Sequence, residues 1–208
     1  MEDVLAPIRV PFPELTYLRL FKFLCAPATV IPDSFLGGSA PRLRHFELSG
    51  IPFPGFPNLL LSANRLVSLR LFSIPDSGYV SPEAMVALLR ALSNLEALFL
   101  GFQYPQSHPD RKRKRQSLPP PKRSILPALG EFHFKGVVEY LEEFLTSIET
   151  PQLDEMHIDF FFQMDIDFLR LAQFFNRTPT LGARNQAHVR LDEMGISVTL
   201  LARGGFEH

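Results

Sequence analysis

The sequence lacks the features that mark secreted and membrane proteins. A single cysteine, Cys25, rules out an intramolecular disulfide and favours a reducing compartment. The chain starts Met-Glu-Asp without the basic and apolar stretches of a signal peptide, and no run of about eighteen apolar residues occurs. We therefore expect a soluble protein of the cytoplasm or the nucleus that makes no contact with a membrane.

The sequence also lacks a strong charge and the motifs of common active sites. The formal net charge of its 208 residues is −1, which gives no overall attraction to nucleic acid. A phosphate-binding loop, a nucleophile elbow, a paired-cysteine metal motif and a His-Glu-x-x-His helix are all missing. The sequence thus predicts a protein that is not an enzyme, with no catalytic residue, no cofactor and no metal.

Leucine, phenylalanine and proline are what the chain has in quantity. It holds 20 phenylalanines, no tryptophan and 19 prolines, which tend to precede apolar runs. A pattern, Leu-x-x-apolar-x-apolar, occurs six times: Leu15/Leu18/Leu20, Leu43/Phe46/Leu48, Leu66/Leu69/Leu71, Leu95/Leu98/Leu100, Leu129/Phe132/Phe134 and Leu153/Met156/Ile158. Two residues before the leading leucine stands a turn-forming residue: Pro13, Pro41, Asn64, Ser93, Pro127 or Pro151.

The spacing of this pattern is typical of leucine-rich repeats. Successive leading leucines are 28, 23, 29, 34 and 24 residues apart, against about 20–29 residues for such repeats. Side chains alternate along a strand, so the fourth and sixth positions point into a core that only stacked neighbours can complete. We therefore expect an α/β fold over residues 1–208: a single leucine-rich-repeat solenoid of about six repeats, with a parallel sheet on the concave side and helices or irregular turns on the convex side.

The segments between the strands differ in composition. Apolar residues at helical spacing predict helices at 81–92, 137–148 and 166–177. Ser81 is the expected N-cap of the first of these, followed by Pro82 in the first turn. The stretches 31–37 and 56–62 are short and rich in proline and glycine, which favours single turns or extended chain.

The two ends depart from the pattern. After Leu181 the alternation shifts to Val189 and Leu191, and a turn at 192–195 leads to a second apolar run at 196–200. We expect a seventh strand and a closing strand, which together form a degenerate capping repeat. Residues 1–11 are too short for a cap, so the start is expected to be truncated.

Several segments resemble a known family. FPELTYLRL (12–20), APRLRHFEL (40–48), the proline-rich tract before residue 126 and the whole of 126–163 are similar to the repeat region of the F-box/leucine-rich-repeat family of mushroom-forming fungi. The resemblance covers nearly the whole chain. It implies that the repeats hold a protein to be ubiquitinated, while an N-terminal F-box docks on the adaptor subunit of a cullin-type ubiquitin ligase. This sequence shows no F-box, so ligase subunits are expected as partners only if one precedes the chain.

The third and fifth positions of the pattern point away from the core and predict a wall that can bind a protein. Tyr, Arg and Phe are residue types that anchor interfaces. The residues assigned to partner binding are Tyr17, Arg19, Glu47, Arg70, Phe99, His133 and His157, of which all but Tyr17 should form one lateral row. In the alternative interpretation, Arg19, Glu47 and Arg70 are an ordinary cross-strand ladder of mutually neutralising charges, contributing a few tenths of a kcal/mol per pair.

Two histidines of this row, His133 and His157, should lie side by side with Glu131, Glu155 and Asp159 nearby. A metal site is conceivable because histidine and carboxylate groups are common ligands. A flat strand wall is not a closed cage, however, so a proton-sensitive patch is the favoured interpretation.

The long interval between the fourth and fifth repeats contains a basic, proline-rich insertion at 104–124. It holds seven of the chain's 21 basic residues, including the run Arg111, Lys112, Arg113, Lys114 and Arg115. Its low apolar content predicts a disordered loop. The run can serve as a nuclear-import signal or, less in keeping with the net charge, as a nucleic-acid contact, and the alternative is a solvated loop.

The function predicted from the sequence is a protein-binding leucine-rich-repeat scaffold, related to the substrate-receptor part of an F-box ubiquitin ligase adaptor. Its protein partner is not identifiable from the sequence. The alternative is a stand-alone structural or decayed repeat module with no ligase link, directed to the nucleus through its basic loop.

Overall fold

The computed structural model describes residues 10–22, 31–32, 34–52, 58–103, 123–161, 169–182, 186–192 and 195–201. The strands are β1 (Tyr17–Phe21), β2 (His45–Ser49), β3 (Ser68–Ile74), β4 (Ala97–Phe102), β5 (Ser124–Ile125), β6 (Glu131–Gly136), β7 (Ile148–Glu149), β8 (Glu155–Phe161), β9 (Gln186–Asp192) and β10 (Gly195–Leu201). The α-helices are α1 (Asn58–Ser62), α2 (Pro82–Leu89), α3 (Val138–Ser147), α4 (Leu169–Arg177) and α5 (Pro179–Gly182). Two short 3-10 helices are η1 (Phe35–Gly38) and η2 (Asp76–Gly78).

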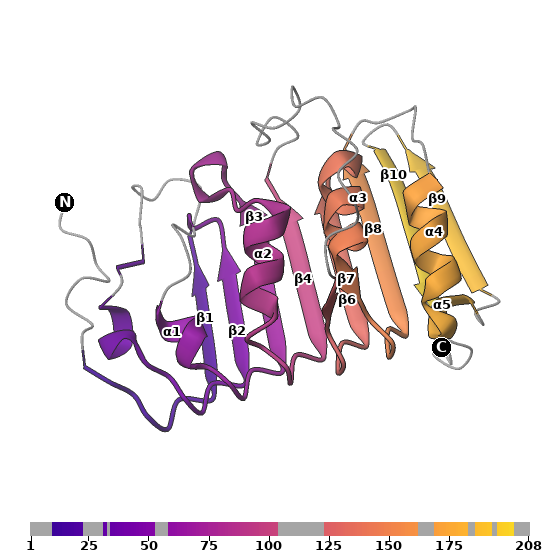
Figure 1. The fold of residues 1–208 in the computed structure, drawn as a ribbon. Helices are drawn as coiled ribbons and strands as arrows, with labels where there is room; N and C mark the ends of the chain where they lie inside the picture. Colours follow the sequence, from indigo (N-terminus) through magenta and orange to yellow (C-terminus); the bar gives the residue numbers. More distant parts are fainter. Residues whose placement is uncertain are drawn as a thin grey trace, which may run out of the picture.

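The fold is α/β, built on one mostly parallel sheet of eight strands in the order β1-β2-β3-β4-β6-β8-β10-β9. The strands from β1 to β8 are all parallel, and β10 runs antiparallel to both of its neighbours. Helices α2, α3 and α4 lie side by side over one face of the sheet (Figure 1). We call this the helix-covered face and the opposite one the open face.

Each of the six pattern copies begins with a β-turn that ends on its leading leucine. The leucine N–H donates to the carbonyl three residues earlier, over 3.1–3.4 Å, in every copy: Leu15 to Phe12, Leu43 to Ala40, Leu66 to Ala63, Leu95 to Leu92, Leu129 to Leu126 and Leu153 to Thr150. The turn-forming residue noted in the sequence occupies the second position of each turn, where a fixed φ near −65° suits proline. The recurrent proline is therefore explained by the β-turn that precedes each strand.

A second set of hydrogen bonds joins each copy to the next. The carbonyl that follows the leading leucine accepts two N–H groups from the following copy, at 2.7–3.0 Å. This occurs at the carbonyls of Thr16, Arg44, Val67, Glu96 and Gly130. Because the equivalent carbonyl makes the same pair of bonds in five successive copies, neighbouring strands begin in register. The strand register therefore follows from the turns and not from side-chain packing alone.

The hydrophobic core lies between the sheet and the helices. The fourth and sixth pattern positions are buried from β2 to β8, and on β6 they are Phe132 and Phe134, at most 1 % exposed. These two rings pack against α3, where Phe144 stacks on Phe132 at 5.5 Å and Tyr140 stacks on Phe134 at 5.8 Å. A Cβ atom on Gly136 would come within 2.6 Å of Phe134, so this position accepts only glycine without movement of the ring.

The returns between strands match their composition. Ser81 caps α2 by accepting a hydrogen bond from the N–H of Ala84 at 3.2 Å, with Pro82 at the start of the helix, as predicted. The later segments form α3 and α4, although Ile166 of the predicted third helix lies outside the described residues. The two short early returns form single turns, η1 and α1.

The C-terminal end differs from the sequence prediction in its order. A continued array would place β9 beside β8, but β10 pairs with β8 and β9 is the outer strand. Only two residues separate β9 from β10, and such a short link joins antiparallel neighbours, because a parallel connection needs a dozen or more residues. The pair is therefore a hairpin docked through its second strand.

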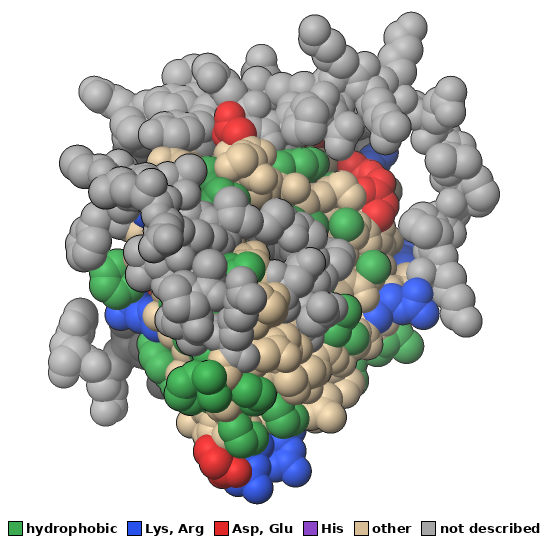
Figure 2. All heavy atoms as spheres, turned by 90° about the vertical axis from the view of Figure 1, so that its left-hand side faces the viewer, with side chains coloured by type: hydrophobic (Ala, Val, Ile, Leu, Met, Phe, Trp, Pro, Cys, Tyr) green, Lys and Arg blue, Asp and Glu red, His purple; other side chains and the backbone are tan. Residues whose placement is uncertain are grey.

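The opposite end of the sheet exposes hydrophobic side chains. Figure 2 looks onto this end and shows hydrophobic side chains at the surface beside acidic and basic ones. Val10, Phe12, Tyr17 and Phe21 are 48–66 % exposed. The inward residues of β1, Leu18 and Leu20, are only partly buried, since among the described strands β1 has a neighbour on one side only.

The basic insertion needs one correction. Residues 104–122, including Arg111, Lys112, Arg113, Lys114 and Arg115, lie outside the described residues, as does Cys25. Ser124, predicted as the last residue of a disordered loop, is buried in β5, where it pairs with Ile148 of β7. Within the described residues, no helix is both long and apolar enough to cross a membrane.

Candidate functional site

The open face carries the predicted lateral row. Six residues are cross-strand partners in order from β1 to β8: Arg19, Glu47, Arg70, Phe99, His133 and His157. The hairpin extends this row, because Thr199 of β10 pairs with His157 and His188 of β9 pairs with Thr199. Tyr17 stands one row below at the exposed edge strand, with its ring 6.2 Å from that of His45.

Four members of the row form a continuous stack of planar groups, which we call the planar stack: Arg70, Phe99, His133 and His157. The guanidinium carbon of Arg70 lies 4.2 Å from the centre of the Phe99 ring. Phe99 in turn stacks on His133 at 4.2 Å and 23°, and His133 stacks on His157 at 5.4 Å and 27°. The four residues are register partners on successive strands, and adjacent strands are about 4.8 Å apart, so their side chains come into contact.

The expected charge ladder extends over only part of the row. Arg19 pairs with Glu47 through Nε at 2.9 Å. Arg70 forms no ion pair with any residue that the structure describes, and it lies over Phe99 instead. The expected ion pair is therefore present between Arg19 and Glu47, whereas the guanidinium of Arg70 contacts the Phe99 ring.

A shallow hollow of about 340 Å³ opens beside the planar stack, toward the carboxyl ends of β3, β4, β6 and β8. Phe72, Phe99, His133, Lys135 and Asp159 are among the residues that line it. It also borders on a β-bulge in β3, where Ser73 has a positive φ of 49°.

Gly101 is one of the residues that line this hollow. A Cβ atom there would meet its nearest neighbours at 3.7–3.9 Å, which is ordinary contact. Unlike Gly136, Gly101 is therefore not required by crowding, and its missing side chain leaves the space open between Phe72 and Lys135.

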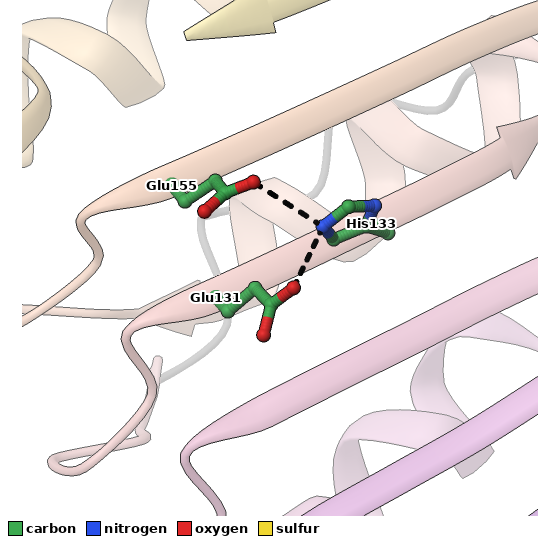
Figure 3. Close-up of side chains that lie close together, drawn as sticks. All are labelled: Glu131, His133 and Glu155. Atoms are coloured by element: carbon green, nitrogen blue, oxygen red, sulfur yellow. Dashed lines mark ion pairs between the residues drawn. The ribbon is translucent and has the colours of Figure 1, made fainter. Parts of the chain in front are cut away.

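One ring nitrogen of His133 faces two carboxylates. Its Nε2 atom lies 2.9 Å from an oxygen of Glu131, two residues earlier on β6, and 3.7 Å from an oxygen of Glu155 on β8. Figure 3 shows both carboxylates directed at the same ring nitrogen from two adjacent strands. Despite the short distance, Nε2 forms no hydrogen bond with any described residue, since the Glu131 oxygen lies out of line with the N–H direction.

The surroundings of His133 favour its neutral form. Burial lowers its pKa below the ordinary value, and the neighbouring His157 and Arg70 act in the same direction, while Glu155 and Asp159 oppose them. His157 is held separately: its Nδ1 lies 2.5 Å from the Thr199 hydroxyl and its Nε2 3.4 Å from Asp159. The two histidines are thus adjacent but have different partners.

Several of these features could not be read from the sequence pattern. Nothing in the sequence pattern indicated a hollow lined by Phe72, Gly101, Lys135 and Asp159. Thr199 was placed on a closing strand and not beside His157. The signal that could have found it is the two-residue link between β9 and β10, which requires a hairpin.

Comparison with protein-family models, with curated proteins and with solved structures found no match to this chain.

Proposed function

We propose that the chain is a leucine-rich-repeat solenoid whose open face binds another protein. Six copies of one turn-and-strand unit, joined by the same pair of backbone hydrogen bonds at each step, support the repeat assignment. In such arrays the strand face that no helix covers is the surface available to partners.

The observation that carries the binding role is the planar stack. Arginine and aromatic residues supply most of the energy of typical protein interfaces. Phe99 is only 8 % exposed and holds the guanidinium of Arg70 over its ring. A cationic group fixed in this way loses little conformational freedom when a partner binds, so less of the interaction energy is cancelled by ordering.

The hollow supports the same conclusion. Its volume of about 340 Å³ is at the small end of the range for ligand pockets, about 300–1,000 Å³. It has aromatic walls in Phe72 and Phe99 and charged groups in Lys135 and Asp159. This combination suits one large side chain of a partner protein, with its polar end near the charged groups.

The ligase connection rests on the family resemblance of the repeats. If the family relation holds, the chain presents the partner for ubiquitination, inside the cytoplasm or nucleus. The intact mass of the protein from its own cells, with the proteins that co-purify, tests this part. A species well above 23.6 kDa with additional N-terminal sequence and ligase subunits would support it. A 23.6 kDa species without those subunits would leave a stand-alone repeat protein.

Site-directed photo-crosslinking in those cells tests the binding role itself. A crosslinking amino acid at Lys135, on the rim of the hollow, is expected to capture one defined protein. The same group at Ala87, exposed on α2 of the helix-covered side, is the matched control and should not capture it. The adduct at Lys135 should disappear in an Arg70→Ala background. Capture from Ala87 alone would place the interface on the wrong side and refute the proposal.

A further inference from the structure

The most specific polar cluster on the open face is formed by Glu131, His133 and Glu155. One donor atom from each of the three lies within 4.8 Å of the other two. The cluster follows from the fold: Glu131 and His133 are two residues apart on β6, so they share a face, and Glu155 is the register partner of Glu131 on β8. No flexible loop takes part in positioning these side chains.

Two features of the cluster are unfavourable for the protein alone. Glu131 and Glu155 lie directly opposite each other on adjacent strands, and like charges in such pairs repel. Neither forms an ion pair with a lysine or arginine among the described residues. Between them, the Nε2 atom of His133 is inaccessible to solvent and forms no hydrogen bond in the described structure. A cation between the three groups would relieve both.

The separations around Nε2 of His133 lie close to those expected around a bound metal ion. A zinc ion about 2.1 Å from each donor, with bond angles of roughly 90–110°, places neighbouring donors about 3.0–3.4 Å apart. The observed separations from Nε2 are 2.9 Å to Glu131 and 3.7 Å to Glu155, one just below and one just above this range, so binding an ion requires shifts of a few tenths of an ångström in the glutamate side chains. A metal ion on the axis of the ring nitrogen would place each carboxylate oxygen off that axis, and Nε2 accordingly forms no hydrogen bond to either carboxylate among the described residues.

We propose that Glu131, His133 and Glu155 bind a divalent metal ion of the zinc type on the open face. One imidazole nitrogen and two carboxylate oxygens are a donor set that zinc accepts, with a water molecule in the fourth position. Stacking of the His133 ring between Phe99 and His157 fixes its orientation, so the nitrogen is directed at the site before the ion arrives. The side chains of the three ligands are 27–44 % exposed, so the carboxylates reach solvent although the Nε2 atom itself is covered.

This site does not depend on the protein-binding role. It lies at the amino-terminal side of the planar stack, whereas the hollow lies at the carboxyl side, and His133 is the residue that they share. Metal binding can therefore be measured on the purified chain in the absence of any partner.

The experiment is a titration of the full chain, stripped of metal with a chelator, with Co²⁺ as a spectroscopic probe and with competition by Zn²⁺. We expect one Co²⁺ per chain with visible absorption bands, displaced by Zn²⁺, and a higher melting temperature with Zn²⁺. Glu155→Gln keeps the side-chain shape and should weaken binding roughly 10–100-fold or more, since even losses behind the ligands cost that much. His133→Phe should abolish binding while the ring stack is retained.

Two matched variants complete the test. Glu47→Gln removes a carboxylate of the same face that pairs with Arg19. His45→Gln removes an exposed histidine at the same register position as Glu131, three strands away on β2. Both should bind Zn²⁺ as the unchanged chain does. Without metal, Glu155→Gln should melt no lower than the unchanged chain, because it removes a repulsion, and this shows that the variant is folded. Absence of stoichiometric binding, or binding lost in His45→Gln or His157→Phe but kept in His133→Phe, would overturn the proposal.

Discussion

The two faces of a single strand, β6, carry different kinds of side chain and are covered differently. Phe132 and Phe134 point toward the helices and are at most 1 % exposed. Glu131, His133 and Lys135 alternate with them along the same five residues and point to the open face. The helix-covered side is closed by rings from α3, whereas the open side is covered only by neighbouring side chains of its own row.

This difference shows how the strand pattern separates positions that stabilise the fold from positions that packing leaves free to vary. Inward positions are fixed by packing, so their residue types vary little beyond Leu, Phe, Met and Ile. At outward positions the turns and the register fix only the place of the residue along the strand, so packing does not restrict which side chain occupies them. Variants on the two faces should therefore differ first in the free energy of unfolding and only secondly in binding.

The largest effect is expected from Phe132→Ala. It removes a fully buried ring that stacks on Phe144, and the free energy of unfolding should fall by about 3–5 kcal/mol. Lys135→Ala on the other face of the same strand should change it by less than about 0.5 kcal/mol. Urea denaturation of both variants measures the difference, and equal losses would contradict the separation of the two faces.

Substitutions at the strand glycines Gly136 and Gly101 test the difference between the two faces more directly. Gly136→Val faces the helices and forces a Cβ atom against Phe134, so overpacking should cost about 1–3 kcal/mol. Gly101→Ala faces the hollow, where a Cβ atom makes only ordinary contacts, and should be neutral within about 0.5 kcal/mol. Gly101→Leu should fold equally well but occupy the hollow and prevent crosslinking from Lys135. If Gly101→Leu leaves the crosslink unchanged, the hollow is not part of the interface.

These two predictions also show what the sequence could and could not provide. The turn residues and the period-two alternation are local signals, so the strands, their register and the row from Arg19 to His157 were predictable from residues such as Pro41 and Leu43. Short-range signals do not decide which strand of a hairpin docks, so the place of β10 was missed. The two-residue strands β5 and β7 carry no pattern at all. Whether Arg70 contacts Glu47 or Phe99 depends on a side-chain rotamer, which the row alone does not specify.

A moderate effect is expected within the planar stack. A double-mutant cycle of Arg70→Ala and Phe99→Leu should give a coupling energy of about 0.5–1 kcal/mol, because the cation lies over a largely buried ring. Chemical denaturation of the two single variants and the double variant provides the value. A coupling energy indistinguishable from zero would mean that Arg70 is not held over Phe99 in solution.

The smallest effect is expected from the ion pair at the edge of the row. Arg19 is 55 % exposed, so solvent screens its attraction to Glu47, and Arg19→Ala should cost no more than about 0.5 kcal/mol. The loss should shrink further in 1 M salt, where charges are screened over about 3 Å. A loss comparable to that of Phe132→Ala would show that the open face carries more of the stability than its packing indicates.

The register between β4 and β6 has a consequence for the length of the chain. Ser68 of β3, Ala97 of β4 and Glu131 of β6 are register partners at the start of their strands. The leading leucines before β3 and β4 are 29 residues apart in the sequence, whereas those before β4 and β6 are 34 residues apart. The turn before each strand restarts the alignment, so extra residues in a return do not accumulate as an offset. Segment length is therefore a freely adjustable parameter of this architecture. A reporter peptide or a whole binding epitope grafted between residues 104 and 122 should therefore leave the register of the row from Arg19 to His157 unshifted.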